Sequence, residues 1–249
     1  MYVHVPWCRS RCGYCDFNTY VPGVLEGVSP GSFVGDTQAE IAVARQALGL
    51  SAVPVSTVFV GGGTPTLLDS ADLVAVLRAI DESFILASDA EVTTEANPES
   101  VTPQSLAELR EGGFNRISFG MQSAVGHVLR VLDREHTPGR TVDAVRWAKA
   151  AGFDEISVDL IYGAPGESDA DWQRSLDLAV SLGPTHISAY SLIVEPGTRL
   201  ARQVGRGELP APDEDVLARR YEMADSAFTA AGLEWYEVSN WARGGASGP

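Results

Sequence analysis

Apolar residues recur along the chain in short runs of β-branched and aromatic side chains, and each run ends in glycine or polar residues. Runs of this kind are typical of buried strands. They predict strands at Tyr2–Pro6, Thr57–Val60, Glu91–Glu95, Arg116–Gly120, Glu155–Ile161, His186–Leu192 and, more weakly, Trp235–Ser239. Segments between them repeat apolar residues at helical spacing. These predict helices at Gly35–Leu48, Ser70–Ser83, Thr102–Glu111, Thr141–Ala151, Ser168–Leu182 and Asp213–Ala231.

Local signals set the helix ends. Ser70 is a good N-cap residue and is expected to cap the helix that it begins. Thr102 is followed by Pro103, which suits the first helical position. Gly152 is expected to end the helix before it, because glycine adopts the left-handed conformation of a helix C-terminus.

A faint internal repeat links these elements. GGFNRIS (112–118), AGFDEIS (151–157) and LGPTHIS (182–188) each join a helix-ending glycine to an Ile-Ser strand, and AGLEWYEVS (231–239) is a looser copy. Repeated strand–helix units indicate a parallel sheet with helical crossovers. Such a sheet can be open and doubly wound or can curve into a barrel. Six successive units without a break favour a full or partial (β/α) barrel.

Composition limits the classes of function. Apolar residues make up 45% of the 249 residues and charged residues 20%, as in ordinary globular proteins. The formal net charge of −15 disfavours nucleic acid and anionic membrane surfaces as partners, since both repel an acidic protein. No apolar run reaches the roughly 18 residues of an integral membrane segment, and the N-terminus lacks a signal-peptide pattern. We therefore expect a cytoplasmic protein.

The three cysteines are Cys8, Cys12 and Cys15, in a C-x3-C-x2-C pattern directly after the first predicted strand. A [4Fe-4S] cluster ordinarily takes four thiolates, so three would leave one iron open, as a reaction centre requires. Zinc bound with His4 or Asp16 as a fourth ligand is an alternative, and so are three inert buried thiols. The close spacing favours a cluster, because zinc sites more often pair cysteines as C-x2-C with a distant second half.

Polar residues and glycines follow the ends of the predicted strands, where barrels carry their chemistry. Gly61–Gly63 can approach a ligand closely or form a simple tight turn. Glu95 can receive an ammonium group or act as a solvated cap, and Arg134 can hold a carboxylate or form a surface ion pair. Asp159 lies inside an apolar run, where it is costly unless it is paired with another residue or bound to a ligand.

The motif CRSRCGYC resembles the cysteine motif of the radical SAM superfamily. In order along the chain, YVHVPWCRSRCGYCDFNTY, FVGGGTPTLL, TTEANPES, RISFGMQS, LDREHT and SVDLIYGAPGES resemble the coproporphyrinogen-oxidase-like branch of that superfamily. Within this branch they are most similar to the heme chaperones of the HemW type. The resemblance covers nearly all of residues 1–243.

The resemblance implies a partial (β/α)6 barrel of the radical SAM type over residues 1–243, followed by a flexible tail at 244–249 and lacking the C-terminal domain of HemW-type proteins. It implies a [4Fe-4S] cluster on Cys8, Cys12 and Cys15, whose open iron binds S-adenosylmethionine and cleaves it to a 5′-deoxyadenosyl radical. The implied cofactor contacts are Gly62, Gly63, Thr64 and Glu95 for the methionine end, Arg134 for its carboxylate, Gln122 and Asp159 for the ribose, Tyr2 and Tyr14 for the cluster or the cofactor, and Ile193 near the adenine.

One position separates two functions within the branch. Oxygen-independent coproporphyrinogen III oxidases carry a fourth cysteine two residues after the third, and here Phe17 takes its place. The resemblance therefore favours a heme chaperone, with heme or porphyrin, a heme-acceptor protein and an electron donor as partners. The alternative is radical oxidative decarboxylation of porphyrinogen propionates, and a structural zinc module is a third hypothesis. Whether the protein acts as an enzyme stays open at this point.

Overall fold

The computed structural model describes residues 1–24, 29–49, 54–134, 137 and 139–244. The tail expected at 244–249 lies outside these residues except for Gly244. The described residues form one eight-stranded sheet in the order β1-β2-β3-β4-β5-β6-β8-β7, and its first six strands run parallel. The strands are β1 (Tyr2–Val5), β2 (Val55–Gly62), β3 (Leu86–Ala96), β4 (Arg116–Gln122), β5 (Glu155–Tyr162), β6 (His186–Ser191), β7 (Leu233–Glu237) and β8 (Asn240–Arg243).

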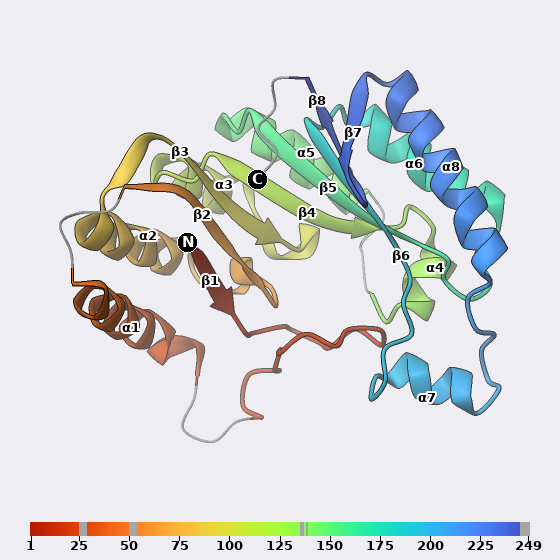
Figure 1. Ribbon diagram of the computed structural model, residues 1–249, viewed down its shortest axis with the longest axis horizontal. Helices are drawn as coiled ribbons and strands as arrows, with labels where there is room; N and C mark the ends of the chain where they lie inside the picture. The colour runs from red at the N-terminus through yellow and green to blue at the C-terminus, as the bar shows by residue number, and fades with distance from the viewer. Residues whose placement is uncertain (25–28, 50–53, 135–136, 138, 245–249) are drawn as a thin grey trace.

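Helices connect the parallel strands and pack in sequence over one face of the sheet. Neighbouring helices contact each other as α1 with α2, α2 with α3, α3 with α5, and α6 with α8. Figure 1 shows α1 and α2 on one flank, α6 and α8 on the other, and the strands fanning out between them. The helices are α1 (Phe33–Leu48), α2 (Ser70–Phe84), α3 (Pro103–Glu111), α4 (Gly126–Val131), α5 (Arg140–Ala151), α6 (Asp169–Ser181), α7 (Arg199–Gly205) and α8 (Glu214–Ala230).

The fold is the partial (β/α)6 barrel that the sequence predicts. Six parallel strands follow one another in chain order, and β1 and β7 stand at opposite edges of the sheet instead of pairing. The sheet is therefore open, and its barrel is incomplete. Among the described residues, none of the helices combines the length and apolar character needed to cross a bilayer.

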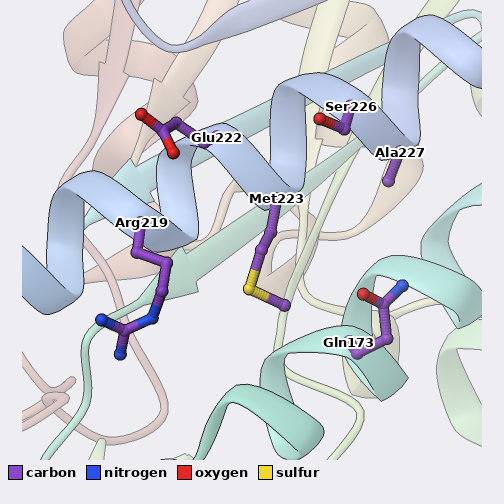
Figure 2. Close-up of a pocket in the computed structure, with 6 residues that line it drawn as sticks. All are labelled: Gln173, Arg219, Glu222, Met223, Ser226 and Ala227. Atoms are coloured by element: carbon purple, nitrogen blue, oxygen red, sulfur yellow. The ribbon is translucent and has the colours of Figure 1, made fainter.

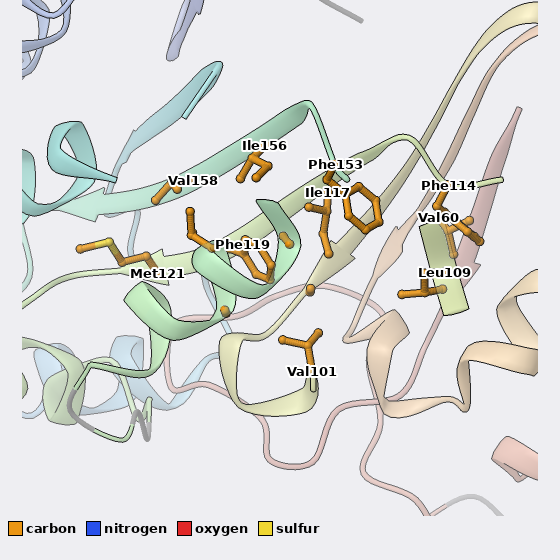
Figure 3. Close-up of a cluster of buried hydrophobic side chains, with 14 of the residues drawn as sticks. Val60, Val101, Leu109, Phe114, Ile117, Phe119, Met121, Phe153, Ile156 and Val158 are labelled. Carbon is orange, nitrogen blue, oxygen red and sulfur yellow. The ribbon is translucent and has the colours of Figure 1, made fainter. Parts of the chain in front are cut away.

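The core lies between the sheet and its helices. Ile117, Phe119 and Met121 alternate along β4 and are fully buried, together with Ile156 and Val158 of β5 (Figure 3). Burying side chains of this size stabilises the fold by about 1.5–3 kcal/mol each.

Because successive side chains of a strand point to opposite faces, the residues between these buried apolar residues face the other side of the sheet. We call this the polar face, and its members are Glu91, Glu95, Arg116, Ser118, Ser157, Asp159, His186 and Ser188.

The sequence prediction of a cap at Ser70 is wrong by one residue. Asp69 occupies the N-cap position of α2, and Ser70 is the first helical residue. The Ser70 hydroxyl instead donates a hydrogen bond to the Glu108 carboxylate of α3. Both Asp and Ser are good caps, so the local sequence does not distinguish them. The cap at Thr102 and the helix end at Gly152 are confirmed.

The last predicted strand also differs from expectation. The looser fourth repeat does not add another parallel strand, because β7 and β8 form an antiparallel hairpin. Through this hairpin, β8 pairs antiparallel with β6 and places Trp241 opposite Ile187. Trp241 is fully buried whereas Trp235 is exposed, so the hairpin is anchored by the half of its sequence that the prediction missed.

Candidate functional site

The cysteine loop follows β1 and is closed on itself by the backbone. The amide of Cys8 donates to the carbonyl oxygen of Tyr20 at 3.0 Å, and the amide of Tyr20 donates to that of Pro6 at 2.7 Å. Trp7 is buried beneath this bridge. At the far side of the loop, the Gly13 carbonyl accepts a hydrogen bond from the Leu200 amide of α7 at 2.8 Å. The loop is thus closed at its base and tied to α7 at Gly13.

The three thiols of the loop are free and partly exposed. Burial raises the pKa of the Cys8 and Cys15 thiols, and the charges of their neighbouring cysteines add to this effect. Thr64 Oγ1 donates to Cys8 Sγ at 3.9 Å, and Arg134 Nη1 donates to Cys12 Sγ at 3.6 Å. Two of the three sulfur atoms therefore have a hydrogen-bond donor from the barrel.

Within the described part of the chain, no three His, Cys, Asp or Glu side chains are arranged to hold a single metal ion. The donors that the loop offers are three thiols, and two of them have a hydrogen-bond donor from the barrel. This donor set fits a [4Fe-4S] cluster, whose irons are bound by cysteine thiolates.

The glycine turn after β2 lies directly against β1 and the cysteine loop. Gly62 has a φ of 111°, and a Cβ there would lie 2.5 Å from the ring of His4. A Cβ at Gly63 would lie 2.5 Å from the carbonyl oxygen of Trp7. The Thr64 amide donates to that same oxygen at 2.7 Å. Glycine is required here because the backbones approach too closely for any side chain.

Two carboxylates meet on the polar face beside this turn. Glu95, at the end of β3, accepts a hydrogen bond from the Gly62 amide at 2.9 Å. Both oxygens of Asp159 on β5 accept from the Ser118 hydroxyl, at 3.0 and 2.9 Å. Burial, together with the charge of Asp159, raises the pKa of Glu95 to about 7. Burial also raises the pKa of Asp159, although hydrogen bonds from serines oppose it. The site therefore holds acidic groups that a cation would stabilise.

Arg134 supplies the opposite charge. Its Nη2 donates to the Gly120 carbonyl oxygen at 2.8 Å, whereas its buried Nε has no hydrogen-bond partner among the described residues. A buried donor without an acceptor is costly, and a ligand carboxylate would satisfy it. Gln122 lies beside this group, since a Cβ at Gly120 would be 2.9 Å from Gln122 Nε2 and 3.0 Å from Arg134 Nη2. Gln122 has a φ of 63°, a left-handed conformation that costs about 1–2 kcal/mol outside glycine.

The remaining predicted residues, Tyr2, Tyr14 and Ile193, differ in their burial and contacts. The Tyr2 hydroxyl and His4 Nδ1 are hydrogen-bonded at 2.8 Å, and His4 Nε2 contacts the Asn18 carbonyl oxygen of the cysteine loop at 2.9 Å. Tyr14 packs into a small apolar cluster with α4 and α7, and burial raises the pKa of its hydroxyl. Ile193 follows β6 and is 63% exposed.

Two serines of the site were not predicted from the sequence. Ser118 hydrogen-bonds Asp159, and Ser188 stands opposite Asp159 in the strand register and lowers the pKa of its carboxyl by hydrogen bonding. Both are the last residue of the Ile-Ser repeat. The Ile-Ser repeat could therefore have identified both serines as site residues, because equivalent positions on neighbouring parallel strands fall on the same face.

A separate hollow of about 460 Å³ opens on the outer surface between α6 and α8 (Figure 2). Met223 points from α8 into the space above α6, and the hollow contains none of the site residues predicted from the sequence. Its lining residues are Gln173, Arg219, Glu222, Met223, Ser226 and Ala227. The hollow lies on the helical layer and is not part of the candidate site on the polar face.

A loop of three cysteines at the carboxyl end of a partial parallel barrel defines a class of protein. Residues 2–179 match the radical SAM superfamily, and the chain belongs to that superfamily. Membership implies a [4Fe-4S] cluster and S-adenosylmethionine. The resemblance stated from the sequence is thereby confirmed at the level of the superfamily.

Individual relatives show which branch of the superfamily the chain belongs to. The chain is 55% identical to the heme chaperone HemW of Mycobacterium tuberculosis (strain H37Rv) over 98% of this chain and 62% of that protein. It is 34% identical to the heme chaperone HemW of Escherichia coli, over 98% and 63%. It is 40% identical to the mouse mitochondrial radical S-adenosyl methionine domain-containing protein 1, over 99% and 54%. The HemW-like branch is confirmed, and the chain spans about three fifths of the length of these curated relatives.

A solved structure gives the same result for the fold. The chain superposes on the coproporphyrinogen III oxidase HemN of Escherichia coli, described as a radical SAM enzyme, with a TM-score of 0.85 and 27% identity. The match covers 97% of this chain and 55% of the oxidase.

Proposed function

We propose that residues 1–243 form the radical SAM core of a cytoplasmic heme chaperone. In this proposal the chain binds a [4Fe-4S] cluster and S-adenosylmethionine, takes up heme and delivers it to an acceptor protein. Free thiols rather than disulfides support the cytoplasmic part of the proposal. Relatives that are 55% and 34% identical to this chain are named as heme chaperones.

The observation that carries the cofactor part is a buried carboxyl group and a buried guanidinium with one unpartnered nitrogen, both beside the cysteine loop. Burial and the charge of Asp159 raise the pKa of Glu95 to about 7. Arg134 has a buried Nε without an acceptor. An amino acid end carries both the ammonium and the carboxylate that would satisfy these two groups. When bound, the cluster supplies an electron to the cofactor.

Within this proposal each residue has a defined role. The thiolates of Cys8, Cys12 and Cys15 would hold the cluster. The methionine end of the cofactor would lie along the glycine turn. The proposed contacts are Gly62, Gly63, Thr64 and Glu95 for the methionine end, Arg134 for its carboxylate, Gln122 and Asp159 for the ribose hydroxyls, Tyr2 and Tyr14 for the cluster or the cofactor, and Ile193 for the adenine.

Electron paramagnetic resonance tests the cofactor part. The protein is reconstituted anaerobically with iron and sulfide, reduced with dithionite and measured with and without S-adenosylmethionine. We expect a reduced [4Fe-4S] signal that shifts when the cofactor is added, and no shift in an Arg134→Met variant with the same iron content. A cluster signal that ignores the cofactor in the wild type would contradict the proposed binding site.

Heme binding and oxidase chemistry are separated by two further measurements. Phe17 is 59% exposed at the position where oxygen-independent oxidases carry a cysteine, which supports the chaperone. Titration with heme should give a saturable absorbance band and transfer of heme to an apo acceptor. The fold likeness to HemN favours coproporphyrinogen III oxidation as the second candidate. Anaerobic conversion of coproporphyrinogen III to protoporphyrinogen IX, without saturable heme binding, would support that candidate instead.

A further inference from the structure

Asp133 departs from a local rule at the turn that carries Arg134. Helix α4 ends in a Schellman motif, in which the Asp133 amide donates to the Arg130 carbonyl oxygen at 3.2 Å. The Arg134 amide donates to the Leu129 carbonyl oxygen at 2.9 Å. Glycine is the usual residue at the left-handed position of this motif, which aspartate tolerates less well. Here Asp133 occupies that position with a φ of 52°. The chain thus accepts backbone strain one residue before Arg134.

The carboxylate of Asp133 reaches two other segments of the chain. Its Oδ1 pairs with Arg199 Nη1 of α7 at 3.2 Å. Its Oδ2 lies against the backbone of the cysteine loop, because a Cβ at Gly13 would clash with it. The Gly13 carbonyl oxygen also accepts the hydrogen bond from the Leu200 amide of α7. Each carboxylate oxygen therefore faces a different segment, and a glycine at position 133 would make neither contact.

The same three segments share a small apolar cluster that is separate from the main core. The cysteine loop contributes Tyr14, α4 and its C-cap contribute Val128 and Leu132, and α7 contributes Leu200. In Figure 1 the chain that leaves β1 runs across to α7, and α4 lies above α7. An ion pair as exposed as that of Asp133 contributes little to stability. Stability therefore does not account for an aspartate in a glycine position, whereas placement of the loop does.

Arg134 transmits this placement to the candidate site. Its Nη1 donates to Cys12 Sγ at 3.6 Å, and Cys12 is the neighbour of Gly13 in the chain. Two consecutive residues of the turn thus contact two consecutive residues of the cysteine loop, Arg134 with Cys12 and Asp133 with Gly13. If the loop moved away from Asp133, the distance between the Arg134 guanidinium and the Cys12 sulfur would increase.

We propose that Asp133 is a positioning residue, whose carboxylate holds the cysteine loop and α7 against the turn that carries Arg134. The inference rests on the proposed function, in which Arg134 binds the carboxylate of S-adenosylmethionine and Cys12 binds the cluster. Asp133 aligns the guanidinium with both of them by fixing Gly13 on one side and Arg199 on the other. It acts through Arg134 and the loop and is not a catalytic residue.

Asp133→Gly separates this role from a structural one. Glycine removes the left-handed strain, so the melting temperature should rise or stay within about 2 °C of the wild type. The affinity for S-adenosylmethionine should nevertheless fall about tenfold, because Arg134 loses its alignment with the ligand. The midpoint potential of the cluster should become more negative, because a hydrogen bond to a ligand sulfur stabilises the more negative, reduced cluster. A purely structural residue would lower stability and affinity together.

Calorimetry measures binding of S-adenosylmethionine to the cluster-loaded protein, and a redox titration followed by electron paramagnetic resonance measures the potential. Ile85→Gly is the matched control, since Ile85 also has a left-handed φ, 64°, after α2, and it should change neither quantity. Arg199→Gln should shift both quantities in the direction of Asp133→Gly. Added to Asp133→Gly, it should cause no further change, because the two residues form one contact. Arg206→Gln, which breaks the pair with Glu208 after α7, is its control.

The outcomes are distinct. Unchanged affinity and potential in Asp133→Gly, at equal iron content, would overturn the inference, and so would additive effects of the Asp133 and Arg199 changes. If Asp133→Gly does not take up iron, Asp133→Asn carries the same test, because asparagine tolerates the left-handed conformation and keeps the shape of the side chain without its charge. A wild-type cluster that does not bind S-adenosylmethionine would contradict the proposed function instead, and the potential would still test Asp133.

Discussion

Glu95→Gln should stabilise the cofactor-free protein at the same time as it removes its affinity for S-adenosylmethionine. Burial and the charge of Asp159 raise the pKa of Glu95 from 4.5 to about 7. A carboxyl group with a raised pKa binds its proton more tightly in the folded chain. Its contribution to stability is therefore full below pH 4.5 and is lost as pH rises through 7. The glutamine amide stays neutral at every pH and still offers an oxygen to the Gly62 amide.

The magnitude follows from the two pKa values. Each unit corresponds to about 1.36 kcal/mol, so ionisation of Glu95 costs at most about 3 kcal/mol of folding free energy above pH 7. For a chain of this size, 1 kcal/mol shifts the melting temperature by about 2–4 °C. Glu95→Gln should melt up to about 6–12 °C higher than the wild type at pH 8, and the difference should close towards pH 5.

Thermal unfolding followed by circular dichroism from pH 5 to pH 8 measures this difference. Glu82→Gln, an exposed carboxylate on α2, is the matched control and should stay within about 2 °C of the wild type. In the wild type, affinity for S-adenosylmethionine should fall about tenfold from pH 8 to pH 6, because protonated Glu95 cannot hold an ammonium group. A melting difference that is constant with pH, or a destabilised Glu95→Gln, would refute the reasoning.

Three other substitutions have defined outcomes. Cys12→Ala should abolish the brown absorbance and the bound iron while circular dichroism stays that of the folded barrel; full iron content would contradict the ligand assignment. Gly63→Ala should destabilise the fold by about 1–3 kcal/mol in urea unfolding, because its Cβ would meet a loop carbonyl oxygen at 2.5 Å. Gly35→Ala in the open surface of α1 is its control and should be neutral or stabilising. Ser118→Ala removes the hydrogen bonds to Asp159 and should weaken S-adenosylmethionine binding by about tenfold or more, measured by calorimetry; an unchanged affinity would count against that contact.

The parallel part of the fold was predictable because each unit carries its own local signals. The apolar runs, the caps and the Ile-Ser repeat identified six strands in their spatial order. The hairpin of β7 and β8 was not predictable in this way, since it depends on Trp241 meeting the core beneath β6. The short helices α4 and α7 were not predicted from the sequence for a similar reason. They are six and seven residues long and are stabilised by packing with Tyr14 rather than by periodicity.

The candidate site was predictable in its chemistry and less so in its geometry. The resemblance named the charged residues, but only the structure shows the orphaned Nε of Arg134 and the left-handed backbone of Gln122. The fifth strand is buried along most of its length on both faces. Asp159 is tolerated there because hydrogen bonds from serines compensate the buried carboxylate.

The backbone bond between Gly13 and Leu200 also bears on the order in which the protein is made. The ribosome synthesises the cysteine loop first, yet the residues that support it come from positions 64, 134 and 200. The nascent loop therefore has its three thiols long before it has its partners. The bond from Leu200 can form only after α7 has been synthesised, so the loop gains its full set of contacts late in translation although its cysteines are made early.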